Sequence, residues 1–203
     1  MLETLLPRLI IKPQRALDPR HYFAPAEARE VWLEIGFGGG EHLVTQAERN
    51  PDIGIIGAEP YIAGTAKLLA KVAATGIENV RLYQSDARDI IEALPDASLS
   101  RIFVLFPDPW PKTRHHKRRF ITMPMLDQLA RVMCSEAELR FATDDAGYLV
   151  WALERVIAHG EFRWMAMSPD DWRARPDDWP ETRYESKAIS NGRNCAYLRF
   201  RRV

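Results

Sequence analysis

Several features are scarce in this 203-residue sequence, and each absence excludes a class of protein. The two cysteines, Cys134 and Cys195, lack C-x-x-C spacing, so a disulfide scaffold is excluded and we expect reduced core thiols in a cytoplasmic protein. No run approaches the roughly 18 consecutive apolar residues of a transmembrane helix, and the amino terminus lacks a signal-peptide apolar region, so we expect no membrane contact. No Cys and His residues have the spacing of a zinc site, so we expect no metal.

An excess of charge is also absent, because lysine plus arginine and aspartate plus glutamate both number 28. The overall charge therefore does not indicate a nucleic-acid-binding protein, and any such role must depend on local clusters of basic residues. The length predicts a single domain over residues 1–203. Its first 25 residues, rich in prolines and basic residues with weak periodicity, are predicted to form an N-terminal arm.

Apolar runs and helical patterns alternate along the chain. Strands are predicted at residues 31–35, 53–57, 80–83, 100–106, 138–143, 162–167 and 195–202. Helices are predicted at residues 41–49, 63–75, around 90–94, 123–133 and 148–158. This alternation is typical of an α/β fold, in which a mostly parallel sheet carries helices on both faces.

A glycine turn follows the first predicted strand, with glycines at positions 36, 38 and 40. Such a turn allows backbone amides to approach a ligand closely. Position 41 is Glu41, where a dinucleotide fingerprint requires glycine or alanine, and its carboxylate would repel a pyrophosphate. The turn therefore favours a nucleoside that carries an amino-acid tail over NAD.

One acidic residue lies in or just after each of the first three predicted strands, namely Glu34, Glu59 and Asp86. The carboxyl ends of parallel strands meet at one edge of the sheet, where ligands bind. We expect Glu59 to accept hydrogen bonds from a ribose diol and Asp86 to bind an adenine amino group. For each acid taken alone, the alternative is a helix N-cap or a turn residue.

The fourth strand ends in an elbow that contains three prolines, Pro107-Asp108-Pro109-Trp110-Pro111. Prolines restrict their own backbone and that of the preceding residue, so Asp108 is expected to be held rigidly at the ligand-binding edge. Trp110 either stacks on an unpaired base or packs beneath the elbow. The alternative for the whole segment is an ordinary proline-rich turn.

Residues 112–119, Lys-Thr-Arg-His-His-Lys-Arg-Arg, form a dense basic run after this elbow. Its position favours contact with RNA phosphates, although most runs of charge are solvated surfaces. His115 and His116 have no further Cys or His partners that would complete a metal site.

These residues together resemble the tRNA (guanine-N7-)-methyltransferase family, within the class I S-adenosylmethionine-dependent methyltransferases. The segments that carry the resemblance are LEIGFGGGEHL, GAEPY, SDA, FPDPWPKTRHHKRRF, ATDD and TRYESKA. The resemblance implies a Rossmann-like fold of about seven strands, the last of them antiparallel. It also implies methyl transfer from S-adenosyl-L-methionine to N7 of guanosine 46 in the tRNA variable loop. The products would be N7-methylguanosine and S-adenosyl-L-homocysteine, with tRNA as the partner. No obligate protein partner is evident from the sequence.

The resemblance also implies roles for particular residues. Cofactor contacts are implied at Glu34, Gly36, Gly38, Gly40, Glu59, Asp86, Ala87 and Asp108. Substrate contacts are implied at Lys112, Asp144, Thr182, Arg183, Tyr184 and Glu185, and RNA contacts at Arg114, His115, His116, Lys117, Arg118 and Arg119.

Guanine N7 already presents a lone pair, so this reaction needs no general base, and we expect Asp108 to be the catalytic carboxylate that stabilises the moving positive charge. Asp144 or Glu185 is expected to accept N1–H and the 2-amino group of guanine. The alternative for Asp144 is an Asx turn, and for Glu185 an exposed helix charge. Three other functions are compatible with the sequence: a class I methyltransferase for another RNA, one for a protein or small molecule, and a non-catalytic RNA-binding module.

Overall fold

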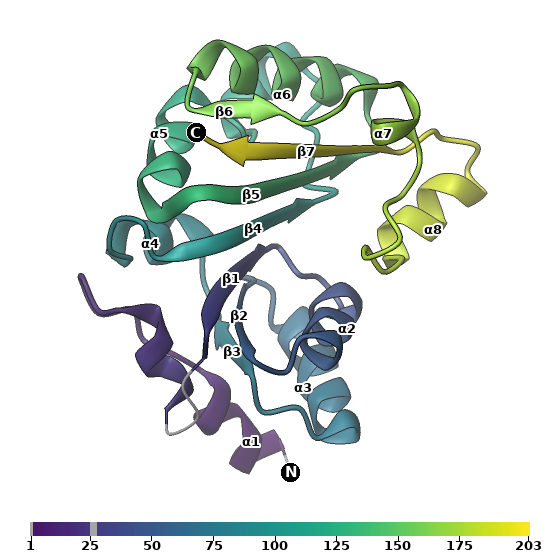
Figure 1. Ribbon diagram of the computed structural model, residues 1–203. Coiled ribbons are helices and arrows are strands. Elements are labelled where there is room, and N and C mark those ends of the chain that lie inside the picture. Colours follow the sequence, from purple (N-terminus) through teal and green to yellow (C-terminus); the bar gives the residue numbers. More distant parts are fainter. Residues whose placement is uncertain (1, 25–27) are drawn as a thin grey trace.

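Seven strands form one sheet at the centre of the molecule (Figure 1), seen in a computed structural model that describes residues 2–24 and 28–203. The strands are β1 (Glu30–Ile35), β2 (Ile53–Ala58), β3 (Val80–Tyr83), β4 (Leu99–Leu105), β5 (Met133–Thr143), β6 (Phe162–Trp164) and β7 (Ala196–Arg202). Their order across the sheet is β3-β2-β1-β4-β5-β7-β6. The pairs from β3 to β5 are parallel, whereas β7 runs antiparallel to β5 and β6. The predicted mostly parallel sheet with an antiparallel last strand is confirmed.

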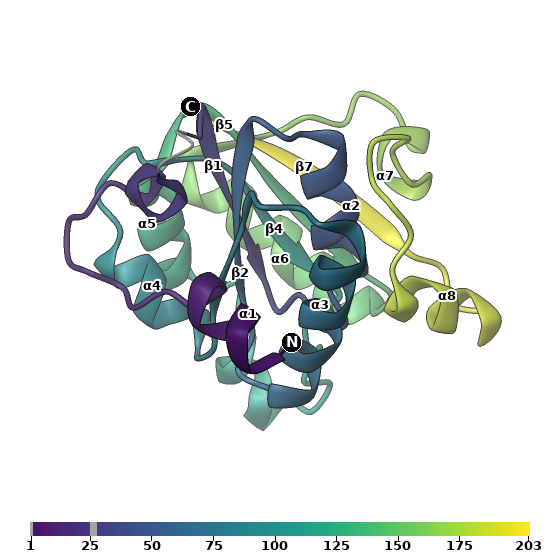
Figure 2. The same ribbon diagram turned by 90° about the horizontal axis from the view of Figure 1, so that it is seen from below.

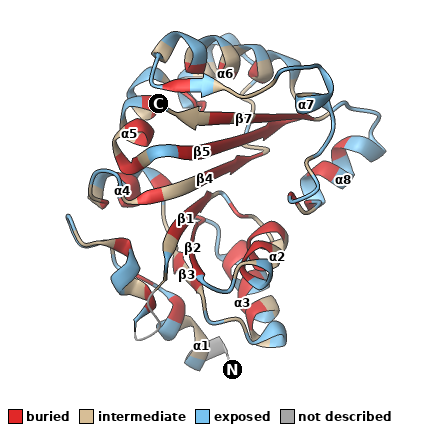
Figure 3. Ribbon diagram, in the orientation of Figure 1, coloured by how far each residue is buried: buried red, intermediate tan, exposed pale blue. Residues whose placement is uncertain are grey.

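Helices cover both faces of the sheet. They are α1 (Leu2–Leu9), α2 (Glu41–Arg49), α3 (Ile62–Thr75), α4 (Ala87–Ala93), α5 (Met123–Val132), α6 (Ala146–His159), α7 (Asp170–Arg173) and α8 (Arg183–Ser190), with 3-10 turns η1 (Pro19–Phe23) and η2 (Thr113–Arg118). One apolar core packs α4, α5 and α6 on one face, and a second packs α1, α2 and α3 on the other. The strands between these two cores are buried along most of their length (Figure 3).

Most predicted boundaries agree with the structure within a few residues. Helix α2 spans the predicted residues, and α3 ends at Gly76, whose φ of 72° and N–H bond to the Val72 carbonyl form the predicted stop. Strand β5 begins earlier than predicted, because Leu99 of β4 already pairs with Met133. Strand β6 is shorter than predicted and ends at Trp164.

The predicted N-terminal arm is partly helical. Helix α1 lies beside α3 (Figure 2), and the N–H of Ile11 bonds to the Leu82 carbonyl at 2.8 Å. The arm therefore covers the β3 edge of the sheet. Residues 1 and 25 at its limits lie outside the described residues, and the single-domain organisation stays a prediction.

Candidate active site

The carboxyl ends of the five parallel strands lie at one edge of the sheet, which is where the sequence predicted a site. The register pairs Ile35 with Ala58 and Val104, Ala58 with Tyr83, and Leu105 with Ala142, so these strands end close together. The order of the chain reverses between β1 and β4, and ligands of open α/β sheets bind at such a reversal. Among the described residues, no helix is both long and apolar enough to cross a membrane.

The glycine turn joins β1 to α2 in a conformation that only glycine adopts easily. Gly36, Gly38 and Gly40 have φ values of 68°, 55° and 76°. A side chain at Gly36 would meet nothing within 4 Å, so open space lies above the start of the turn. The amides of the three glycines already donate within the protein, Gly36 to the Ala58 carbonyl, Gly38 to Glu59 and Gly40 to the Phe37 carbonyl. The turn therefore offers a ligand open space, and the cofactor contacts of these glycines stay a prediction.

Glu59 is buried and fixes this turn. Its Oε2 accepts the N–H of Gly38 and its Oε1 accepts the N–H of Tyr61, both at 3.0 Å. Each carboxylate oxygen has a further lone pair, so a ribose hydroxyl can still be bound. The predicted ribose contact stays a prediction, and the structure adds a role that the sequence did not indicate.

Glu34 and Asp86 already have protein partners. The buried Glu34 carboxylate lies 2.7 Å from Nδ1 of His42 on α2. Asp86 caps α4, which begins at Ala87, by accepting the N–H of Arg88 at 2.9 Å. Asp86 is therefore a helix N-cap, which was the alternative given for this residue, and its carboxylate is still exposed to solvent.

The proline elbow holds Asp108 between two residues with unusual backbones. Phe106 and Trp110 have φ values of 50° and 45°, each costing roughly 1–3 kcal/mol for a residue other than glycine. The Phe106 N–H bonds to the Ala142 carbonyl at 2.8 Å and so holds the elbow against β5. Among the described residues, none donates a hydrogen bond to the exposed Asp108 carboxylate, which is therefore free for a ligand.

Arg119 corrects the prediction that the whole basic run contacts RNA. Only 3% of this residue is exposed, and its Nε donates to the Pro109 carbonyl at 2.8 Å. Its guanidinium lies 5.0 Å from the Tyr148 ring centroid and 4.9 Å from that of Trp151. Arg119 therefore supports the elbow from beneath and does not face phosphates.

The other basic residues of the run form the exposed turn η2. Lys112, Arg114, Lys117 and Arg118 are exposed, and His115 and His116 are half-buried. Trp110 packs edge-on against His115 and beneath the Arg118 guanidinium, 4.8 Å from its centroid. Trp110 thus packs against η2, and its stacking on an unpaired base stays a prediction.

Glu185 is not the exposed helix charge that was one alternative, because it is buried at the start of α8. Its carboxylate forms a capping box with Thr182, and its Oε1 accepts the Tyr197 hydroxyl at 2.5 Å and lies 2.9 Å from the Arg175 Nε. Burial, and then the bond to Glu185, raises the pKa of Tyr197, so this hydroxyl stays protonated and donates. Asp144, at the end of β5, pairs instead with the exposed Arg193 at 2.8 Å.

Helix α8 brings Tyr184, one of the predicted substrate residues, next to the glycine turn. A Cβ built on Gly38 would lie 2.9 Å from Cε2 of Tyr184, so this ring covers the turn. Arg183 and Tyr184 are exposed, as is Lys112. The structure therefore brings α8, the elbow and the glycine turn to one edge of the sheet.

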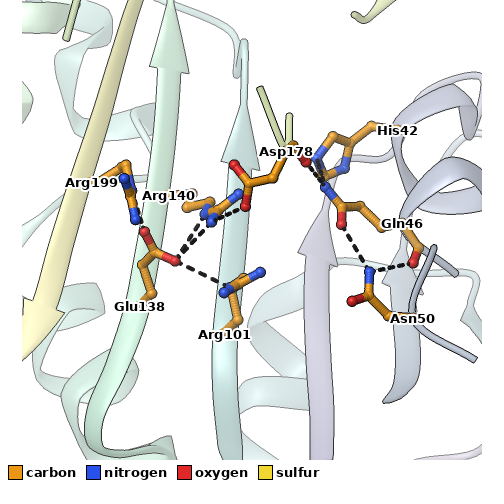
Figure 4. A network of polar contacts seen from close by, with 8 residues as sticks. All are labelled: His42, Gln46, Asn50, Arg101, Glu138, Arg140, Asp178 and Arg199. Carbon is orange, nitrogen blue, oxygen red and sulfur yellow. Dashed lines mark hydrogen bonds and ion pairs between the residues drawn. The ribbon is translucent and has the colours of Figure 1, made fainter. Parts of the chain in front are cut away.

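A buried charge network, which sequence reasoning missed, fastens the segment before α8 to the sheet (Figure 4). Arg140 of β5 is 1% exposed, and its guanidinium bonds to Glu138 at 3.0 Å and to Asp178 at 2.6 Å. Glu138 also contacts Arg199 at 2.5 Å and Arg101 at 3.2 Å. The only sequence signal was a pair of charges, two positions apart, in an otherwise apolar strand.

The same segment is linked to the glycine turn through α2. Gln46 donates to the Asp178 carbonyl at 2.7 Å, and its Nε2 lies 3.4 Å from Nε2 of His42 (Figure 4). His42 in turn bonds to Glu34. Polar contacts therefore connect Glu34 of β1, through His42 and Gln46, to Asp178 in the segment before α8. In the described part of the chain, no group of three or more His, Cys, Asp or Glu side chains is placed to hold a metal ion.

Known proteins resemble this chain in fold and in sequence. A 16S rRNA methyltransferase, KamB, superposes with a TM-score of 0.62 at 17% identity, over 93% of this chain and 99% of that one. An antibiotic-related methyltransferase gives a TM-score of 0.59 at 18% identity, over 94% of this chain and 98% of that one. These likenesses show the class I methyltransferase fold.

Sequence relatives are much closer. Residues 28–198 match the family described as "Putative methyltransferase". The tRNA (guanine-N(7)-)-methyltransferase of Rhodospirillum rubrum is 51% identical over 100% of this chain and 81% of that protein. The protein of the same name from Ruegeria sp. (strain TM1040) is 54% identical over 94% of this chain and 73% of that protein. Such identity over nearly the whole chain, on a class I methyltransferase fold, places this protein in the tRNA (guanine-N(7)-)-methyltransferase family.

Proposed function

We propose that this protein transfers a methyl group from S-adenosyl-L-methionine to N7 of a guanosine in tRNA. The observation that carries the proposal is the close identity, over nearly the whole chain, to relatives named for this reaction. The free Asp108 carboxylate, which follows β4, supports it, because β4 is the parallel neighbour of β1 and the glycine turn follows β1. We further propose the variable loop as the site of modification and the cytoplasm as the location.

The residues at the sheet edge fit the proposed cofactor. The turn at Gly36, Gly38 and Gly40 leaves open space beside Gly36 for a nucleoside with an amino-acid tail, and Glu59 has lone pairs for the ribose. Asp86 and Ala87 begin α4 at the end of β3, where an adenine would lie. When bound, the cofactor supplies an electrophilic methyl group on a sulfonium.

Methyl transfer forms an N7–C bond and breaks an S–C bond, so positive charge moves from sulfur to the purine. Guanine N7 has no proton to lose, and the protein mainly has to align N7 with the methyl carbon. Such alignment is worth up to ~7–11 kcal/mol in model systems. The Asp108 carboxylate, held by the elbow, stabilises the spreading positive charge without reorganising.

Asp144 is the better of the two candidate acids for the guanine edge. The Glu185 carboxylate is buried and already bound by its capping box, by Tyr197 and by Arg175. Within residues 2–24 and 28–203, the ion pair of Asp144 is with the exposed Arg193, whose side chain can move aside or share the carboxylate. A carboxylate at this position can accept N1–H and the 2-amino group in parallel.

The direct test is incubation of the protein with S-adenosyl-L-methionine and bulk tRNA, followed by nucleoside analysis. We expect 7-methylguanosine to appear, and mapping of the modified nucleotide tests the variable-loop assignment. Methylation of another RNA or of a protein, with none of tRNA, would replace the proposal. Tight tRNA binding without any methyl transfer would indicate the non-catalytic module.

Glu59→Ala is expected to weaken S-adenosyl-L-methionine binding by about 1.5–3 kcal/mol, because hydrogen bonds to a charged group are lost. Glu59→Gln, whose amide oxygen still accepts one backbone N–H, should lose less. Calorimetry on the folded variants measures both, and Glu48→Ala on the exposed side of α2 is the control. Unchanged affinity in Glu59→Ala would remove this residue from the cofactor site.

Replacing Arg114, Lys117 and Arg118 together by alanine should flatten the plot of log K for tRNA against log salt concentration. Each phosphate contact contributes a slope of roughly 0.7–0.9, so we expect a change of about 2 to 3 units. Arg119 is left in place because it supports the elbow. The matched control replaces Arg29 and Arg49, which precede β1 and β2 at the opposite edge of the sheet. If both variants keep the wild-type slope, η2 is an ordinary solvated surface.

A further inference from the structure

A cavity of about 610 Å³ lies beside the candidate active site and has no assigned role. Trp172 and Arg173 of α7 line one wall, and Ile189 of α8 with Arg193 and Asn194 lines the other. Helices α7 and α8 and the start of β7 lie at the same end of the sheet as the carboxyl ends of β4 and β5 (Figure 1). The cavity therefore opens where a polynucleotide would pass the site.

The charge of this cavity distinguishes it from the two others described. No acidic residue is among the described residues that line it. The cavity of about 440 Å³ on the far side of α7 is lined by Asp170, Asp171 and Asp177. The cavity of about 830 Å³ near α1 also has three acidic residues, Glu48, Asp52 and Glu78. Two arginines also line each of these cavities, so each has one more acidic than basic residue, whereas the third has two arginines and no acid. A phosphate-bearing ligand is therefore attracted most strongly to the third.

The side chains of the cavity have the chemistry that binds an unpaired nucleotide. Trp172 is half-buried, so its indole is fixed while part of it stays accessible, and the Arg173 guanidinium lies 4.8 Å from its ring centroid. Bases stack on indole and guanidinium planes, and arginines bind phosphates. Arg173, Arg193 and Asn194 are all exposed and supply donors on both walls.

Arg193 connects the cavity directly to the reaction site. Its Nη1 lies 2.8 Å from the Asp144 carboxylate, the acid proposed for the guanine edge. The cavity and the guanine site are thus on two sides of one ion pair. A nucleotide next to the target guanosine in the RNA is therefore within reach of the cavity whenever the guanine lies at Asp144.

We propose that this cavity binds a nucleotide adjacent to the methylated guanosine, with its base against Trp172 and its phosphate at Arg173 or Arg193. This inference rests on the proposed function, because it takes tRNA as the substrate. It adds a subsite that holds the tRNA strand after the target base has left its stack. The subsite acts on tRNA binding and leaves the cofactor site unchanged.

The first test is photochemical cross-linking of the wild-type protein to tRNA, once the methylated guanosine has been mapped. The tRNA carries 4-thiouridine immediately before or after that guanosine. We expect the cross-linked peptide to include Trp172 or Arg173 for one of the two positions. Cross-links found only outside residues 165–195 for both positions would overturn the proposal.

The second test measures tRNA affinity of variants. Trp172→Ala is expected to raise the Kd for tRNA by roughly 5- to 100-fold, the loss typical of one base–aromatic stack. Trp172→Phe keeps an aromatic face and should bind close to wild type. Met167→Ala, an exposed residue on the acidic side of α7, is the matched control and should change nothing.

Affinity for S-adenosyl-L-methionine shows whether each variant is folded. If Trp172→Ala no longer binds S-adenosyl-L-methionine, Arg173→Ala is used instead, because Arg173 is exposed, and it is also expected to raise the Kd for tRNA. Wild-type tRNA affinity in the folded variants would overturn the subsite. The proposed function is tested separately: it fails if the wild-type protein forms no 7-methylguanosine in tRNA.

Discussion

Asp108→Asn is expected to lower kcat and kcat/KM together, by about 10²–10³-fold, as is typical for loss of one preorganised electrostatic group. The substitution keeps the size of the side chain and removes its charge. The carboxylate has no partner among the described residues, so the substitution breaks no internal contact. Binding of tRNA should change little, because the proposed phosphate contacts lie on η2 and not at Asp108.

Single-turnover methyl transfer, at saturating tRNA and cofactor, isolates the step that Asp108 affects. Asp52→Asn, an exposed acid at the opposite edge of the sheet, is the control and should be close to wild type. A transfer rate near wild type in Asp108→Asn would show that the elbow has only a structural role.

Glu138→Gln is expected to destabilise the protein by about 3–5 kcal/mol, the usual result of removing one partner from a buried ion pair. Glu138 lies among Arg101, Arg140 and Arg199, and Arg140 is almost fully buried. Without the carboxylate, the buried Arg140 guanidinium keeps Asp178 as its remaining anionic partner among the described residues and is repelled by Arg101 and Arg199. Urea denaturation measures the change in the free energy of unfolding.

Glu136→Gln is the matched control on the same strand, because Glu136 is exposed and its pair with Arg201 is a surface salt bridge. Such pairs contribute about 0–1 kcal/mol. If both variants unfold within about 1 kcal/mol of wild type, the network does not stabilise the fold in the way that buried pairs do.

The same network predicts how stability depends on pH. Burial alone would raise the pKa of Glu138, but Arg140 and Arg199 outweigh it and hold the pKa below its ordinary value of 4.5. A lowered pKa contributes stability that is fully present above the unfolded value and is lost as the pH falls through the folded value. Wild-type stability should therefore fall below about pH 4.5, and the fall should be shallower in Glu138→Gln.

Much of the fold could be predicted from the sequence, because the patterns that indicate strands, turns and helix ends each lie within a short segment. Apolar runs marked the strands, and glycines marked the turn after β1 and the end of α3. Helix α1 was missed because it is short, contains Pro7, and is stabilised by packing on α3. The buried position of Arg119 was also not readable, because its partners Tyr148 and Trp151 come much later in the chain.

The location of the site was predicted, but the internal bonds of its acids were not. Glu59, Asp86 and Asp108 lie at the carboxyl edge because parallel strands must end together there. The capping box at Thr182 and Glu185 had a sequence signal, T-x-x-E, that indicates a helix start and a buried carboxylate. The Arg140–Asp178 contact had none, because which residues of a long loop meet a sheet depends on tertiary packing.

The two strained residues of the elbow bear on attempts to make this protein more heat-resistant. Glycine in place of Phe106 or Trp110 would relax a φ near 50°, but it would also remove an aromatic side chain that packs on the core at Phe106 and on His115 and Arg118 at Trp110. It would also give the segment around Asp108 more conformations, so its carboxylate would spend less time where the charge develops. Relief of strain at these two positions is therefore offset both by lost packing and by a less firmly held Asp108. Heat resistance is better sought at positions outside the elbow.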